Sequence, residues 1–184
     1  MGIGIACIGW GSLVWDPRSL PVVGEWRADG PMLPIEFARE SNDGRITLVL
    51  CDGVKAVQSY WCFLAVEDVS AAMLALAHRE GITSRMAKDI GRWNLVDDKS
   101  YGCCDAEIAE WAKTRGLDGV VWTNLPCGLR NSRGVMPTED AVLAHLAQLT
   151  GESYERAKRY VELAPAQIDT TYRPLIVSSL NLGA

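Results

Sequence analysis

The segment IACIGWGSLVWDP, residues 5–17, decides which class of fold the chain can adopt. Its apolar run predicts a buried strand, and the two glycines that follow, Gly9 and Gly11, begin the GxGxxG pattern of dinucleotide-binding folds. That pattern needs a third glycine where Val14 stands, and then a helix. The sequence Trp-Asp-Pro follows instead, and a proline at this point is poor helix interior. We therefore reject a Rossmann fold, and we reject a P-loop because no Gly-Lys-Ser/Thr sequence ends the segment.

Two interpretations of this turn remain open. Its glycines allow the backbone to approach a ligand closely, with the N–H groups of Gly11, Ser12 and Leu13 pointing into a pocket. Alternatively, the segment is a tight turn filled by the side chains of Trp10 and Trp15. The spacing of the residues does not choose between a ligand-binding turn and a packed one.

The next part of the chain predicts antiparallel strands. A first strand over 3–8 is followed by a corner rich in glycine, proline and charged residues that reaches about residue 34. The segments IEFARES and RITLVL flank Asn-Asp-Gly, which is a strong hairpin signal. A second turn at Asp52-Gly53 leads into a long strand over 54–66. We expect these three strands to form a meander.

Beyond residue 66 the hydrophobic period becomes helical. Asp68 is a good N-cap and Gly81 a good left-handed terminator for a helix over 69–80. The remaining expected elements are helices at 105–115, from Thr138 to Gly151 and from Ser153 to Pro165, a strand at 117–125 and an extended segment at YRPLIVSSL, residues 172–180. The class is therefore α+β. We expect one domain, residues 1–184, with the C-terminal helices (about 138–164) packed on it.

Composition limits the partners and the location of the protein. The chain has 184 residues, of which 48% are hydrophobic and 22% charged, with a formal net charge of -5. Because no dense basic run is present, we expect neither nucleic acid nor a membrane surface as a partner. No apolar run reaches the roughly 20 residues that span a bilayer, and no leader sequence is evident. We expect a cytoplasmic protein that binds a small molecule; the sequence does not determine its oligomeric state.

The six cysteines and two histidines suggest no metal site. The cysteines show no CxxC spacing, so we expect free thiols and no metal or organic cofactor. His78 and His145 are far apart and are expected at surface positions of helices. Cys103 or Cys104, ahead of a predicted helix, would permit a Cys-His hydrolase only if the helix lowered the thiol pKa; packing is the simpler expectation.

Glu80 occupies an unusual position in the helix predicted over 69–80. At 100° per residue it continues an apolar stripe formed by Val69, Met73 and Leu76. It also lies in the last turn, where the helix dipole disfavours an anion. A carboxylate that is partly shielded from water is a candidate general base. The alternatives are that Glu80 extends into solvent or pairs with Arg85.

Three segments together resemble the γ-glutamyl cyclotransferase-like family, and most closely its glutathione-degrading ChaC-type branch. IGWGSLVWDP is similar to the family's Tyr-Gly-Ser-Leu signature, FARESNDGRITLVL to the following strand pair, and EDVSAAMLALAHREG to the helix that carries the catalytic glutamate. The resemblance covers residues 3–85. It implies a mixed β-barrel or sheet with flanking helices, and an enzyme that releases 5-oxoproline from glutathione or another γ-glutamyl amide.

The resemblance also implies roles for individual residues. Glu80 would be the acid/base, and the segment Gly9, Trp10, Gly11, Ser12 and Leu13 would bind the γ-glutamyl part of the substrate. The family's tyrosine is Trp10 here, which leaves two alternatives open: a non-catalytic binding module on the same fold, or an enzyme that acts on a different amine or amide.

Arg39 and Arg45 are candidates to bind a substrate carboxylate through bidentate hydrogen bonds. The alternative for each arginine is a solvated or ion-paired side chain on the sheet. We expect Arg39 to bind substrate.

Overall fold

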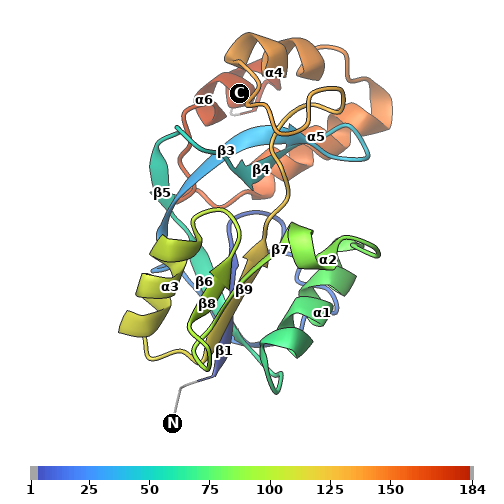
Figure 1. Ribbon diagram of the computed structural model, residues 1–184. Coiled ribbons are helices and arrows are strands. Elements are labelled where there is room, and N and C mark those ends of the chain that lie inside the picture. Colours follow the sequence, from blue (N-terminus) through green and yellow to red (C-terminus); the bar gives the residue numbers. More distant parts are fainter. Residues whose placement is uncertain (1–3, 183–184) are drawn as a thin grey trace. The chain divides into compact units, whose positions relative to one another are not determined.

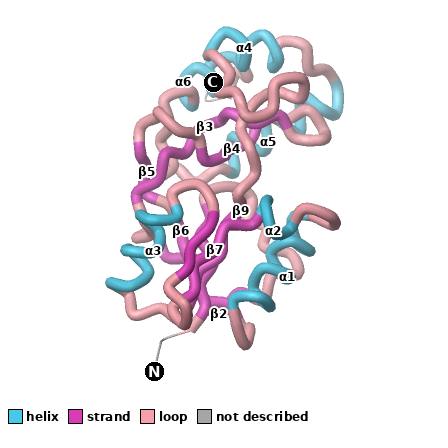
Figure 2. Tube along the Cα trace, viewed as in Figure 1, coloured by secondary structure: helices cyan, strands magenta, loops and turns pink. Residues whose placement is uncertain are grey.

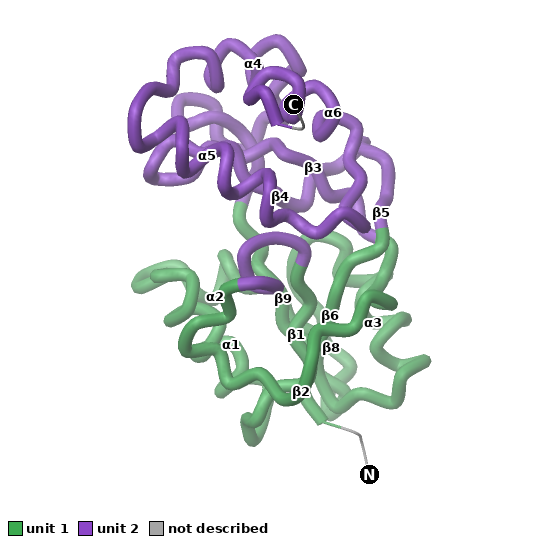
Figure 3. The backbone as a smooth tube through the Cα atoms, turned by 180° about the vertical axis from the view of Figure 1, so that it is seen from behind, with its two compact units in different colours: residues 1–9, 16–32, 58–125 green, residues 10–15, 33–57, 126–184 purple. Residues whose placement is uncertain are grey.

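The computed structural model describes residues 4–182, which divide into two compact units (Figure 3). Of the described residues, unit 1 comprises 4–9, 16–32 and 58–125, and unit 2 comprises 10–15, 33–57 and 126–182. The expected single domain stays a prediction, and each unit is described by itself below.

Unit 1 contains a six-stranded mixed sheet (Figures 1 and 2). Its strand order is β2-β6-β1-β9-β7-β8. The strands are β1 (Ile5–Gly9), β2 (Val22–Arg27), β6 (Tyr60–Leu64), β7 (Ile90–Asn94), β8 (Lys99–Tyr101) and β9 (Gly119–Thr123). β1 runs antiparallel to β6 and parallel to β9, and all its residues are buried. This interior position explains why the first strand is continuously apolar.

Helices cover both faces of the unit 1 sheet. In Figure 1, α1 (Val69–Glu80) and α2 (Met86–Asp89) lie on one side, and α3 (Asp105–Thr114) lies on the other. The prediction for α1 is confirmed to the residue. The Asp68 carboxylate accepts a hydrogen bond from the Ala71 N–H at 2.8 Å, and Gly81 ends the helix with φ 69°. The helix predicted over 105–115 and the strand predicted over 117–125 are confirmed as α3 and β9.

Unit 2 contains a three-stranded sheet with the order β4-β3-β5. Its strands are β3 (Met32–Glu40), β4 (Ile46–Leu50) and β5 (Ala56–Gln58). The predicted hairpin between β3 and β4 is confirmed: the Ser41 N–H donates to the Arg45 carbonyl at 2.8 Å, and Gly44 has φ 85°. The predicted meander is wrong, because β5 lies on the far edge of β3 and not beside β4.

The long strand predicted over 54–66 is also wrong, because the chain changes sheets at Ser59. The Ser59 N–H and hydroxyl both donate to the Pro31 carbonyl, at 3.1 and 2.7 Å, and the Ser59 carbonyl accepts the Gly30 N–H at 3.0 Å. Ser59 is fully buried, and these hydrogen bonds take the place of the strand-to-strand hydrogen bonds that a continuous strand would make there. Apolar residues on both sides of Ser59 conceal the break, so β5 and β6 read as one strand in the sequence.

Several helices and strands of the structure differ from those predicted from the sequence. β2 lies within the predicted corner; it is largely exposed and its register shifts between Val23 and Arg27, so it shows no clean alternation. β7, β8 and α2 were not predicted. The last segment is a helix, α6 (Arg173–Ser179), and not extended. Pro174 stands in its first turn, where a missing N–H costs nothing.

The other helices of unit 2 begin and end close to the predicted positions. α4 (Glu139–Leu146) begins after Thr138, whose hydroxyl accepts the Ala141 N–H at 3.2 Å, and α5 (Gly151–Leu163) ends before Pro165. Gly151 begins α5 and does not end α4, which corrects the predicted boundary. Among residues 4–182, no helix is both long and apolar enough to cross a bilayer. The α+β class is confirmed.

Candidate functional site

Glu80 lies at the end of α1, on the apolar face predicted from its spacing. Val69, Met73 and Leu76 are buried, and the Glu80 side chain is only 18% exposed. Its partner differs from the predicted one. The Oε1 atom of Glu80 lies 2.7 Å from an Nη atom of Arg79, whereas Arg85 pairs with Asp89 at 3.5 Å. The carboxylate is therefore held in place by its neighbour in sequence and does not extend freely into water.

Arg79 is the residue in this region that the sequence reasoning missed. Its side chain is 3% exposed, and its second Nη donates to the Asp16 carbonyl at 2.6 Å. A buried guanidinium needs such partners to offset its loss of hydration. The available signal was its spacing from Ala72 and Leu76, which are fully buried on the same face of α1. Within unit 1, Arg79 thus links the end of α1 to the backbone of Asp16.

Two buried thiols lie beside this ion pair. Cys7 on β1 lies directly opposite Cys62 in the register of the adjacent strand β6. Burial, followed by the charges of Cys62 and Glu80, raises the pKa of Cys7 well above its ordinary value, and Arg79 opposes the rise. Burial raises the pKa of Cys62 to about 12. Both thiols are therefore protonated at neutral pH, and none of the six cysteines, all of which lie within residues 4–182, forms a disulfide, as predicted.

Gly9 and the turn that follows it are packed by protein groups. Gly9 is buried in β1, opposite Tyr60 of β6. Within unit 2, the Trp10 side chain is buried and its indole N–H donates to the Leu48 carbonyl at 3.3 Å. The Val14 N–H donates to the Gly11 carbonyl at 3.0 Å, which closes a turn that no helix follows. The rejection of a Rossmann loop is confirmed.

Gly11 is required at its position by Tyr160 of α5. A Cβ atom at Gly11 would lie 2.6 Å from the Tyr160 hydroxyl oxygen. That hydroxyl accepts the Leu48 N–H at 3.2 Å, and the Tyr160 ring packs edge-on against Trp15 with centroids 5.3 Å apart. The close approach that the glycine permits is therefore occupied by a tyrosine of the chain itself. Tyr160 was missed in the sequence because it lies about 150 positions after Gly11.

Ser12 and Leu13 complete the segment expected to bind substrate. Leu13 is buried, whereas Ser12 is half-buried. Ser12 is thus the more accessible side chain of the two.

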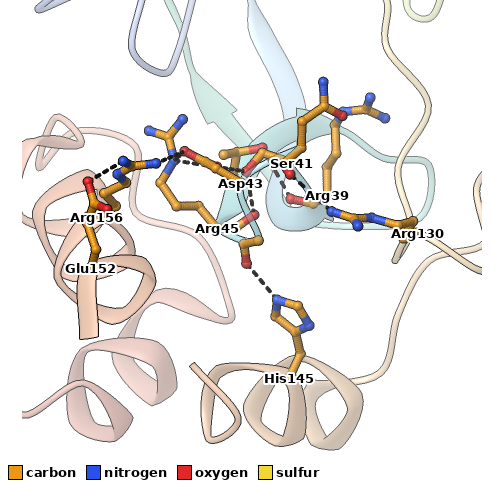
Figure 4. Close-up of polar contacts among 11 residues, drawn as sticks. Arg39, Ser41, Asp43, Arg45, Arg130, His145, Glu152 and Arg156 are labelled. Carbon is orange, nitrogen blue, oxygen red and sulfur yellow. Dashed lines mark hydrogen bonds and ion pairs between the residues drawn. The ribbon is translucent and has the colours of Figure 1, made fainter. Parts of the chain in front are cut away.

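The β3–β4 hairpin carries a network of charged side chains (Figure 4). The Arg39 guanidinium donates to the Pro126 carbonyl at 2.5 Å, and Arg45 pairs with Asp43 at 2.9 Å. Burial acts to raise the pKa of Asp43, but hydrogen bonds from Arg45 and Ser41 outweigh it, so the pKa lies below its ordinary value. The ion-paired alternative is thus observed for Arg45, and the role of Arg39 toward a substrate stays a prediction.

The histidines contact polar groups of the chain. His78 Nδ1 lies 3.0 Å from the Ser19 hydroxyl, and His145 Nε2 lies 2.6 Å from the Gly44 carbonyl oxygen, as Figure 4 shows for His145. No group of three or more His, Cys, Asp or Glu side chains within residues 4–182 is arranged to hold a metal ion.

Comparison with solved structures finds a chain of similar fold. No protein-family model and no curated protein matches the chain. A crystal structure of a glutathione-specific γ-glutamyl cyclotransferase from yeast aligns with 97% of this chain and 98% of its own, at 14% identity and a TM-score of 0.43.

Proposed function

We propose that the protein is a γ-glutamyl cyclotransferase-like enzyme that releases 5-oxoproline from a γ-glutamyl amide, with Glu80 as the acid/base. Three segments between residues 8 and 81 resemble that family in the same order. The observation that carries the proposal is the Glu80 side chain itself: a largely shielded carboxylate in the last turn of a helix, fixed by the buried Arg79. Helix stability alone favours a cation at this position.

The proposed reaction is an intramolecular aminolysis. Glu80 takes a proton from the α-ammonium group of the substrate, and the free amine attacks the γ-carbonyl carbon to form a lactam ring. The attack leaves the ring nitrogen positively charged with two protons. The amide bond then breaks as Glu80 returns its proton to the departing amine, and the ring nitrogen loses its second proton to water, so the lactam and the amine are both released neutral. The protons move among the substrate, one carboxyl group and water, so the step needs no cofactor.

The segment Gly9 to Leu13 is proposed to bind the γ-glutamyl part of the substrate. We assign the backbone N–H groups of Gly11, Ser12 and Leu13 to the negative charge that develops on the carbonyl oxygen. Arg39 is proposed as a partner of a substrate carboxylate.

Trp10 favours a second candidate function. It replaces the family's tyrosine, and its indole N–H is bonded to the Leu48 carbonyl. A substrate contact made by a tyrosine hydroxyl is therefore not reproduced by that N–H. The alternative is a small-molecule-binding module, or an enzyme for another amine or amide.

The decisive assay measures 5-oxoproline release from glutathione, γ-glutamyl amino acids and γ-glutamylamines. We expect turnover of at least one compound, reduced about 10²- to 10⁴-fold in Glu80→Gln, the usual contribution of general acid–base catalysis. Glu67→Gln is the matched control, because Glu67 is exposed just before α1. No release from any compound, or an unchanged rate in Glu80→Gln, would reject the proposed role; binding without turnover would support the module.

A further inference from the structure

Two adjacent cysteines in unit 1 form a thiol pair that the proposed reaction does not use. The Sγ atoms of Cys103 and Cys104 lie 3.6 Å apart, and both residues are half-buried. Cys104 precedes α3 with φ 60°, the left-handed conformation. Residues other than glycine rarely adopt it, and such backbone strain is concentrated at functional sites.

The backbone beside this pair is held by specific contacts. The Cys103 N–H donates to Asn124 Oδ1 at 2.7 Å, and Asn124 Nδ2 donates to the Lys88 carbonyl at 2.9 Å. Gly102 has φ 129°, and a Cβ atom there would lie 3.0 Å from the Cα of Gly91. The two thiols are therefore positioned by the fold before any reaction, which lowers the entropic cost of joining them.

The other neighbouring thiols of unit 1 provide a contrast. Cys7 and Cys62 are buried, and burial raises the pKa of each thiol, so few thiolates form and reagents have no access. Thiolates are the reactive species in disulfide exchange. The half-buried position of Cys103 and Cys104 distinguishes them from that inert pair.

We infer that Cys103 and Cys104 are a redox-active dithiol, which a low-molecular-weight disulfide oxidises to a vicinal disulfide. One protein thiolate attacks a sulfur of the oxidant, forms a mixed disulfide and expels one thiol. The other protein thiolate then attacks the protein sulfur of that mixed disulfide, forms the Cys103–Cys104 bond and expels the second thiol. The protein loses two electrons and two protons, and the oxidant is reduced to two thiols.

The bond is expected to be readily reversible. Adjacent Cα atoms lie about 3.8 Å apart across a trans peptide, whereas disulfides usually join Cα atoms about 4.4 to 6.8 Å apart. A bond outside that range is strained and more easily reduced. The inference is independent of the proposed reaction.

The test treats the reduced full-length protein with glutathione disulfide, alkylates the remaining thiols in denaturant and digests with trypsin. The peptide 100–113 contains Cys103, Cys104 and no other cysteine. We expect it to be unalkylated and lighter by two hydrogens, and the titratable thiols of the chain to fall from six to four. Dithiothreitol should restore both thiols.

Matched variants distinguish this dithiol from general oxidation. Cys127→Ser removes another half-buried thiol and should still lose two thiols, whereas Cys104→Ser should retain a stable mixed disulfide at Cys103. The trivalent arsenical phenylarsine oxide should bind the wild-type protein and Cys127→Ser, but not Cys104→Ser. A wild-type peptide 100–113 that stays doubly alkylated, or carries only mixed disulfides, would overturn the inference without reference to any variant.

Discussion

The end of α1 in unit 1 and the turn at residues 10–15 in unit 2 carry the two parts of the expected site, and they are built differently. The end of α1 holds a buried cation between a carboxylate and a carbonyl oxygen. The turn is packed by aromatic side chains, and its glycine is needed because the Tyr160 hydroxyl lies against it. Packing against Tyr160 thus explains Gly11. Glu80 also has a partner within the chain, the buried Arg79, but its carboxylate stands where helix stability favours a cation. Glu80 is therefore the stronger indication of function.

The largest effect on stability is expected from Arg79→Met. The substitution leaves the shielded Glu80 carboxylate without its cation, and breaking a buried pair in this way costs about 3 kcal/mol or more. Denaturant unfolding measures the change in the free energy of unfolding. Arg18→Met is the matched control, because Arg18 and its partner Asp16 are 61% and 49% exposed, and its loss should change stability by less than about 0.5 kcal/mol. Equal losses of stability in the two variants would show that the buried Arg79–Glu80 pair contributes no more than an exposed ion pair.

A smaller effect is expected from Gly11→Ala, through overpacking against Tyr160. The added methyl group meets the hydroxyl at 2.6 Å, so the loss of stability should be about 1 to 3 kcal/mol. In the background of Tyr160→Phe, which removes that hydroxyl, the same substitution should cost much less. The double-mutant cycle measures this coupling. Additive effects would mean that Tyr160 does not constrain Gly11. The glycine would then be better explained by a ligand that approaches the backbone at this point.

The smallest effect is expected from Asp43→Asn, which contrasts an accessible ion pair with the buried pair of α1. The Asp43 and Arg45 side chains are 27% and 31% exposed, so their pair should contribute less than about 1 kcal/mol. Because the pKa of Asp43 is lowered in the folded state, its contribution is present above the unfolded pKa and is lost as pH falls through the folded pKa. Stability of the wild type and the variant should therefore converge below about pH 4. A difference that grows on acidification would contradict this assignment.

The sequence predicted best where the signals are local. The residues that begin and end α1, Asp68 and Gly81, act through hydrogen bonds and dihedral angles within a few positions, and the helix was placed to the residue. The same holds for the Asn-Asp-Gly hairpin between β3 and β4. Within the candidate site, the face of α1 that carries Glu80 followed from the helical period alone.

The sequence predicted poorly where a partner lies far along the chain. The break at Ser59 depends on Pro31, and the need for glycine at position 11 depends on Tyr160. Neither partner leaves a periodic signal near the residue that it constrains. The exposed edge strand β2 failed for another reason, since an irregular strand open to solvent has no alternation to detect.

The sequence by itself determined the α+β class, the limits of α1 and the apolar face on which Glu80 lies, because these follow from capping and from the spacing of neighbouring residues. Only the tertiary structure decided that Arg79 is the partner of Glu80, that Tyr160 occupies the space above Gly11, and that β5 and β6 belong to different sheets. Burial makes these contacts decisive. A buried charge or polar group must find a partner, and the fold determines which distant group is near enough to supply it.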